Sequence, residues 1–259
     1  MAIITLTSDW GLSDYYVGAV KGVIYSYCPQ AVIVDITHNI TPFDLKNAGF
    51  IVKNCYKNFP EGTIHILGID TEESDEFSHI VVKADGHYFI GCDNGIFSII
   101  IGDTPYEAVT IEIPQDTGYF TFSSRDRFAK VASMLASGCQ LSEIGNPHNS
   151  LKIIFPLQPT YNANFIHGYV IYIDNYQNLI TNISKELFDK VRNKRDFNIT
   201  FTNINYVIKD ILNCYRDAKD VSIMALFGSH GFLEIAINRG NASELLGLNI
   251  DSDVFVKFL

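Results

Sequence analysis

The sequence predicts an α/β N-terminal domain followed by an all-β, barrel-like C-terminal domain. In the first half of the chain, short apolar runs alternate with amphipathic stretches, which is typical of βαβ units. Past the prolines Pro156 and Pro159, β-type runs dominate and helices become scarce. The chain has 259 residues, enough for two hydrophobic cores. We place the boundary between residues 150 and 165 and expect domains over 1–155 and 165–259.

The N-terminal half begins with a strand, a helix and a second strand, over Ile3–Thr7, Tyr16–Tyr27 and Val32–Ile36. A second amphipathic helix is expected over Asp44–Tyr56, and a third strand over Gly62–Leu67. Four further apolar runs have strand lengths, and a helix is expected to follow them. These runs and the helix are Ile80–Lys83, Tyr88–Cys92, Ile96–Ile101, Ala108–Ile113 and Arg125–Ala136.

Short strands separated by Asn and Gly turns fill the C-terminal half, a pattern typical of a small barrel or sandwich. The expected strands are Gly168–Ile173, Phe197–Phe201, Ile204–Ile208, Ile223–Phe227, Phe232–Ile237 and Val254–Phe258. The basic run Lys190–Arg195 follows a helical stretch and is interpreted as a solvated helix end.

Composition restricts the partners. Apolar residues make up 47% and charged residues 19% of the chain, which predicts a folded protein. The formal net charge of −10 argues against a nucleic-acid partner, because a positive field is missing. No stretch is long and apolar enough for a membrane helix, so no membrane partner is expected. Five cysteines without a C-x-x-C pair indicate a reduced, cytoplasmic chain.

Three predicted strand ends carry an aspartate: Asp9, Asp35 and Asp70. Ligands of open α/β sheets bind at this edge, and neighbouring strands would bring the three carboxylates to one acidic pocket suited to a cationic ligand. Asp9 can accept hydrogen bonds from a vicinal diol such as that of ribose. The alternative is that these residues form turns, and that Asp9 or Ser13 caps the helix.

The segment after the second strand holds Asp35, His38 and Phe43. Asp35 and His38 are possible metal ligands, but no further His or Cys cluster accompanies them, so a structural pair is favoured and no metal is expected. Phe43 precedes a helix and is either an apolar wall for a ligand or a hydrophobic staple.

Two polar turns in the C-terminal half combine amide, hydroxyl and ring groups beside a strand. One contains Asp174, Tyr176 and Asn178, and the other contains Ser229 and His230. Aromatic faces with Asn donors and acceptors suit a nucleobase, although Asn-rich turns are also common without a ligand.

Five segments together resemble the S-adenosylmethionine hydroxide adenosyltransferase family, relatives of fluorinase and chlorinase. They are Thr7–Asp14, Ile33–His38, Asp93–Gly95, Asn178–Ile183 and Leu233–Ala236, and the likeness spans nearly the whole chain in matching order. The resemblance implies an α/β domain, a β-barrel domain and a homotrimer whose site lies between one subunit's N-terminal domain and a neighbour's C-terminal domain. It also implies S-adenosylmethionine as substrate, adenosine and methionine as products, and no cofactor.

The resemblance also implies roles for single residues. By position, Asp9 would hold the ribose diol, Asp14 would lie by the methionine amino group, and Phe43 would pack on the ribose. Four residues of the C-terminal half would contact adenine, two as flanking rings and two as polar contacts: Tyr176, Tyr215, Asn178 and Ser229.

The sequence departs from the family at its reacting end. Water-using members carry an aspartate, an arginine about seven residues later, and a histidine in a Thr-Phe-His-Gly-Arg-Asp segment. Asp70 keeps the aspartate, but Phe77 and Ser123 occupy the other two positions. Halide-using members have a hydroxylic residue where this chain has Ser124, yet they lack the aspartate. His79 is a candidate replacement for the imidazole, with an ordinary surface histidine as the alternative.

Two functions follow. One is hydrolysis of S-adenosylmethionine to adenosine and L-methionine by attack of water or hydroxide at C5′, with Asp70 as the remaining base or water-positioning group. The other is a catalytically weak or inactive protein that binds adenosine or S-adenosylmethionine as a sensor or store.

Overall fold

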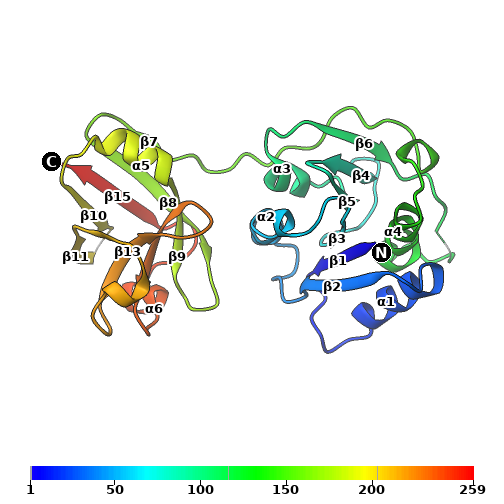
Figure 1. Cartoon of the computed structure of the whole chain (residues 1–259), viewed down its shortest axis with the longest axis horizontal. Helices are drawn as coiled ribbons and strands as arrows, with labels where there is room; N and C mark the ends of the chain where they lie inside the picture. The colour runs from blue at the N-terminus through cyan, green and yellow to red at the C-terminus, as the bar shows by residue number, and fades with distance from the viewer. Residues whose placement is uncertain (1, 116, 203) are drawn as a thin grey trace. The chain divides into compact units, whose positions relative to one another are not determined.

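The computed structural model describes residues 2–115, 117–202 and 204–259 and divides into two compact units, Met1–Phe155 and Pro156–Leu259 (Figure 1). The first unit is α/β and the second is mostly β, which confirms the predicted fold class. None of the helices in the described ranges has the length and apolar character that crossing a membrane requires.

A six-stranded sheet in the order β2-β1-β3-β5-β4-β6 forms the centre of the first unit. Its strands are β1 (Ile3–Ser8), β2 (Val32–Thr37), β3 (Ile64–Gly68), β4 (His79–Ala84), β5 (His87–Cys92) and β6 (Tyr106–Thr110). β1 runs parallel to both β2 and β3, and Ser8 pairs in register with Gly68. The loops that carry Asp9 and Asp70 therefore leave the same edge of the sheet side by side.

Helices cover both faces of this sheet (Figure 1). α1 (Tyr16–Tyr27) and α4 (Ala129–Ala136) pack with residues such as Ile4 on one face, whereas α2 (Leu45–Lys53) and α3 (Ile96–Ile101) pack with Leu67 on the other. The single helix expected over Arg125–Ala136 is a π-helical turn, Ser124–Phe128, followed by α4. Short 3₁₀ turns lie at Tyr56–Asn58 and Leu141–Glu143.

The expected strand over Ile96–Ile101 is wrong, because this segment is α3. Four of its six residues are buried, so the run lacks the polar face that would reveal a helix in the sequence. Gly95 starts the helix at φ 101°, and a Cβ there would lie 2.5 Å from Ile154 Cγ1. Only glycine fits this turn, which directs the chain from β5 into a helix.

The second unit contains one curled sheet with a large hydrophobic core and a smaller cluster at β13 and β14. The main path runs β11-β10-β15-β8-β9-β14-β13-β12, with β7 added on β8. The strands are β7 (Thr160–Tyr161), β8 (Phe165–Ile173), β9 (Leu179–Ser184), β10 (Phe197–Phe201), β11 (Ile204–Ile208), β12 (Ile211–Leu212), β13 (Ile223–Phe227), β14 (Phe232–Ile237) and β15 (Asp253–Phe258).

Sequence analysis missed the strands β7, β9 and β12 and the helix α6 (Ala242–Leu246). It anticipated the helix α5 (Lys185–Arg192) only as the helical stretch before the basic run. The side chain of Ser184 accepts the N–H of Leu187 and so caps α5. The basic run Lys190–Arg195, interpreted above as a helix end, begins in the last turn of α5. The guanidinium of Arg195, which follows the helix, donates to the carbonyl of Val191 over 2.8 Å. A 3₁₀ turn at Tyr215–Asp217 completes the unit.

Candidate active site

A cavity of about 490 Å³ opens at the strand-end edge of the first unit. The loops after β1, β2 and β3 form its walls together with the segment before α4. Three carboxylates and several aromatic rings line it, and no Lys or Arg of the described residues does. The lining residues are Asp9, Trp10, Tyr16, Pro42, Phe43, Gly68, Asp70, Thr71, Glu72, Phe120, Thr121, Phe122 and Ser123.

Asp9 connects two of the loops. Its Oδ2 accepts a hydrogen bond from the backbone N–H of Phe43 over 2.9 Å. Phe43 adopts φ 66°, lines the cavity and is 72% exposed. Burial raises the pKa of the Asp9 carboxyl, against the lowering effect of the Phe43 N–H, and the charge of Asp70 raises it further. Asp9 does not cap α1: the N-cap residue of this helix is Tyr15, whose side chain makes no capping hydrogen bond.

Trp10 forms a flat wall of the cavity. A Cβ at position 68 would lie 2.3 Å from Cζ2 of Trp10, so the indole fits against β3 only because residue 68 is glycine. The indole stacks on His38 with a centroid distance of 6.0 Å and meets Phe122 edge-on at 5.9 Å.

His38 and Asp35 form the favoured structural pair behind this wall. His38 is buried, with Nδ1 2.7 Å from Ser8 Oγ and Nε2 3.2 Å from Asp35 Oδ1. Asp35 lies inside β2 rather than at its end, binds Lys21 over 2.5 Å and does not line the cavity. Only two of the three aspartates predicted at strand ends therefore meet there. Among the residues that the structure describes, no His, Cys, Asp or Glu cluster suits a metal ion.

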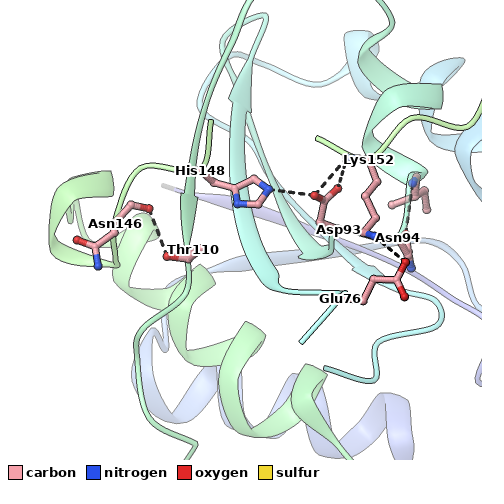
Figure 2. A network of polar contacts seen from close by, with 8 residues as sticks. Glu76, Asp93, Asn94, Thr110, Asn146, His148 and Lys152 are labelled. Atoms are coloured by element: carbon pink, nitrogen blue, oxygen red, sulfur yellow. Dashed lines mark hydrogen bonds and ion pairs between the residues drawn. The ribbon is translucent and has the colours of Figure 1, made fainter. Parts of the chain in front are cut away.

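Asp70 is held through its backbone. It adopts φ 46°, and its carbonyl oxygen accepts the side-chain N–H of Asn94 over 3.0 Å, while Ile69 O accepts the same nitrogen at 3.2 Å. Asn94 follows Asp93, whose buried carboxylate accepts the N–H of Lys152 at 3.0 Å and lies 2.9 Å from His148 Nε2 (Figure 2). The Asp93–Gly95 motif therefore ties the distant 148–152 segment to the end of β5, beside Asp70.

Two candidate reacting serines, the ligand-binding candidate Asp14 and Phe77 at the family's arginine position lie in different surroundings. Ser123 is buried and lines the cavity. Ser124 is also buried but is not part of the lining, and its Oγ makes no hydrogen bond within the described part of the chain. Asp14 is exposed and lies outside the lining. The ring of Phe77 also lies outside it, 4.4 Å from the Nζ of Lys152.

His79 is neither a cavity residue nor the surface histidine considered as its alternative, since it is 1% exposed. Its Nε2 lies 2.9 Å from the carbonyl of Thr71, and its Nδ1 lies 2.9 Å from Nη1 of Arg127. Burial lowers the pKa of His79, and the charge of Arg127 lowers it as well.

Two of the predicted residues of the second unit bind carboxylates, and two are exposed on turns. Asp174 binds both the backbone and the side-chain N–H of Asn178, at 2.8 and 3.0 Å. Tyr176 is 78% exposed on the same turn, and Ser229 is exposed on another. The hydroxyl of Tyr215 donates to buried Glu234 over 2.6 Å, and burial followed by this bond raises the pKa of Tyr215. The charge of Asp174 raises it as well.

Sequence analysis missed Trp10, Glu72, Asn94 and Glu234 as members or supports of these sites. Trp10, Asn94 and Glu234 lie in segments it singled out, and Glu72 follows the predicted site residue Asp70 by two positions. What the sequence does not show is which side chain of each segment faces the cavity and which holds a backbone carbonyl.

The sequence matches two family models. The SAM hydroxide adenosyltransferase N-terminal domain matches residues 4–145, and the C-terminal domain of the same family matches residues 168–255. Together they cover most of both units.

Individual proteins match over nearly their whole lengths. An (R)-S-adenosyl-L-methionine hydrolase of Methanocaldococcus jannaschii is 30% identical and the alignment covers 96% of this chain and 92% of that one. A protein of the same name from Thermus thermophilus is 28% identical, with 96% of each chain covered. A crystal structure of an uncharacterized conserved protein from Thermotoga maritima superposes with a TM-score of 0.89 at 28% identity, covering 98% of this chain and 99% of that one.

Proposed function

The chain belongs to the SAM hydroxide adenosyltransferase family, and we propose that it binds S-adenosylmethionine and hydrolyses it to adenosine and L-methionine. The cavity that holds both Asp9 and Asp70 among aromatic walls carries this proposal. Its carboxylates and ring faces favour a positively charged ligand such as a sulfonium.

The proposed reaction is a displacement at C5′. The oxygen of water forms a bond to C5′ while the C5′–S bond breaks. The electron pair of the C5′–S bond remains on the sulfur, which leaves as methionine. Asp70 accepts the proton that water loses and later releases it to solvent. The enzyme's main contribution is alignment, because a sulfonium is already a good leaving group.

Ser123 lines the cavity where the family resemblance places a histidine. A serine hydroxyl can orient water but does not accept its proton near neutral pH. We therefore expect turnover to be slow, with Asp70 as the base and Ser123 as a hydrogen-bonding wall. Ser124, whose Oγ makes no bond among the described residues, is a second hydroxyl near the same turn.

We further propose that the protein acts as a homotrimer in the cytoplasm. The diol-side residue Asp9 belongs to the first unit, and the adenine-side residues Tyr176, Asn178, Tyr215 and Ser229 belong to the second. The family resemblance assigns the two sets to one ligand held by neighbouring subunits, which a trimer would supply. Light scattering tests the assembly, and a stable monomer at micromolar concentration contradicts it.

Release of products tests the activity. The purified protein is incubated with S-adenosylmethionine, and adenosine and methionine are quantified by chromatography. Equal amounts of the two are expected, and they should be absent in an Asp70→Ala control. Binding of S-adenosylmethionine without release would instead favour the binding-protein function, and absence of binding at millimolar concentration would contradict both.

A further inference from the structure

A partly buried contact connects two walls of the cavity. Arg127, in the π-helical turn that begins after Ser123, reaches back to the loop after β3. Its Nη1 lies 2.7 Å from Glu73 Oε2 and 2.9 Å from Nδ1 of His79. The side chain of Arg127 is only 12% exposed, so this ion pair is shielded more than an ordinary surface pair. The loop after β3 and the turn after Ser123 are thus joined directly.

The hydrogen bonds of His79 determine which of its ring nitrogens carries the proton. The carbonyl oxygen of Thr71 can only accept, so Nε2 of His79 carries the proton. Nδ1 is then the acceptor for the guanidinium N–H of Arg127. A neutral His79 therefore bonds the loop at Thr71 and Arg127 at once, and both of its nitrogens are occupied. In this arrangement His79 is a support of the cavity wall and has no free nitrogen for a reacting proton.

We propose that Arg127, His79 and Glu73 are positioning residues that hold the Asp70–Glu72 wall at a fixed distance from the Ser123 wall. The inference rests on the proposed function. Thr71 and Glu73 closely follow Asp70, so fixing them limits the movement of the Asp70 carboxylate. Because the family's arginine and histidine positions are Phe77 and Ser123, alignment of Asp70 in this chain depends on supports outside the cavity.

The ribose-side wall does not share these contacts. Asp9 and Phe43 are held by their own hydrogen bond in other loops. Loss of the Arg127 contact should therefore lower the rate of reaction while leaving adenosine binding unchanged. A misplacement of about 1 Å is enough to lower a rate by about a hundredfold.

Glu73→Gln is the test variant, because Glu73 is on an exposed loop and the substitution keeps its size. We expect kcat for S-adenosylmethionine to fall by about tenfold or more while the Kd for adenosine stays within about twofold. Arg127→Met should act on the same interaction, so the double variant should be no slower than the slower single variant. Amide hydrogen exchange of residues 70–73 should accelerate in Glu73→Gln.

Lys152→Gln is the matched control. Lys152 Nζ binds the same loop further along, at Glu76 over 3.1 Å (Figure 2). It also lies over the ring of Phe77, and neither Glu76 nor Phe77 lines the cavity. Its kcat and its exchange at residues 70–73 should equal those of the wild type.

An unchanged kcat in Glu73→Gln would overturn the inference, as would a parallel loss of kcat, adenosine affinity and thermal stability. If the wild type releases no adenosine, the proposed function fails separately. The exchange comparison between Glu73→Gln and Lys152→Gln then decides whether the contact fixes the loop.

Discussion

The side-chain amide of Asn94 donates to the backbone carbonyl of Asp70 over 3.0 Å, across 24 residues of sequence. Asn94 is itself buried, and the same nitrogen contacts Ile69 O. A residue with φ 46° needs such support, because the left-handed region is unfavourable for a side chain with a Cβ. The Asp93–Gly95 motif thus supplies the backbone position from which Asp70 enters the cavity.

Replacing Asn94 by Ala should therefore affect both stability and turnover. Two carbonyl oxygens lose their donor, and we expect the free energy of unfolding to fall by about 1–3 kcal/mol. The kcat should fall with it, while adenosine affinity, which depends on Asp9, should stay constant. Urea unfolding and product release measure these effects. A variant with wild-type kcat would show that Asp70 needs no support from Asn94.

Asp9→Asn should weaken adenosine binding by about 1–3 kcal/mol, because it removes a charged acceptor from a part-buried site. Calorimetry measures the change. Asp14→Asn is the control, since Asp14 is exposed, lies outside the cavity and is expected at the methionine end of the ligand. Adenosine affinity should be unaffected by Asp14→Asn, and equal losses in both variants would contradict the assignment of the diol to Asp9.

Gly68→Ala should displace the indole of Trp10. The added Cβ would lie 2.3 Å from Cζ2, a distance that forces the ring to move. Trp10 is the single tryptophan of the chain, so tryptophan fluorescence, excited selectively over the tyrosines, reports on this site. We expect a shifted emission spectrum and a weakened fluorescence response to adenosine. An unchanged spectrum would show that Trp10 is not held against β3.

The strand-end rule explains why much of the site was predictable. Asp9 and Asp70 follow parallel neighbouring strands, so the strand and turn signals of the sequence are enough to bring them together. Asp35 is expected to follow the same rule, but β2 continues to Thr37, so Asp35 lies inside the strand, in register with Leu6, and its side chain binds Lys21 and His38. The contacts of Arg127 with Glu73 and His79 span 48 to 54 residues and leave no local pattern.

The same reasoning applies to the fold. Helix α3 has the pattern of a strand because a short helix buried on most sides has no amphipathic period. Strand β9 escapes prediction because Thr181 and Asn182 give it a polar appearance, although both are buried. Thr181 Oγ1 donates to Leu233 O, and Asn182 accepts the N–H of Tyr169, so tertiary hydrogen bonds satisfy groups that the sequence alone suggests are exposed.

His65 should make stability depend on pH. Burial, with a smaller effect of His87, lowers the pKa of His65 from 6.5 to about 3. Between these two values the unfolded chain binds a proton that the folded chain does not. The free energy of unfolding should therefore fall as the pH is lowered through this window, by up to about 1.4 kcal/mol per pH unit. His65→Gln should have a shallower slope in urea unfolding between pH 6.5 and pH 4, and an equal slope would contradict this.

Restoring an imidazole at position 123 should accelerate turnover. Ser123 is 2% exposed and lines the cavity, so the ring of Ser123→His has to enter the space beside Asp70. General-base assistance of this kind typically contributes about 10²–10⁴ in rate, so even a misaligned imidazole should measurably increase kcat. The kcat of this variant should fall when the pH is lowered below the pKa of the new imidazole, because only the neutral ring accepts a proton.

Phe77→Arg should add little to this gain. The Phe77 ring lies outside the cavity and 4.4 Å from the Lys152 ammonium, so an arginine there would meet a like charge on the outer side of the loop. The combined variant should therefore be no faster than Ser123→His, unless Lys152→Gln is added.

In every background Asp70→Ala should abolish adenosine release, because Asp70 is the carboxylate that enters the cavity directly after β3. Full activity after Asp70→Ala would instead assign the base to another residue, with Glu72 as the next carboxylate to replace, since it lines the same wall.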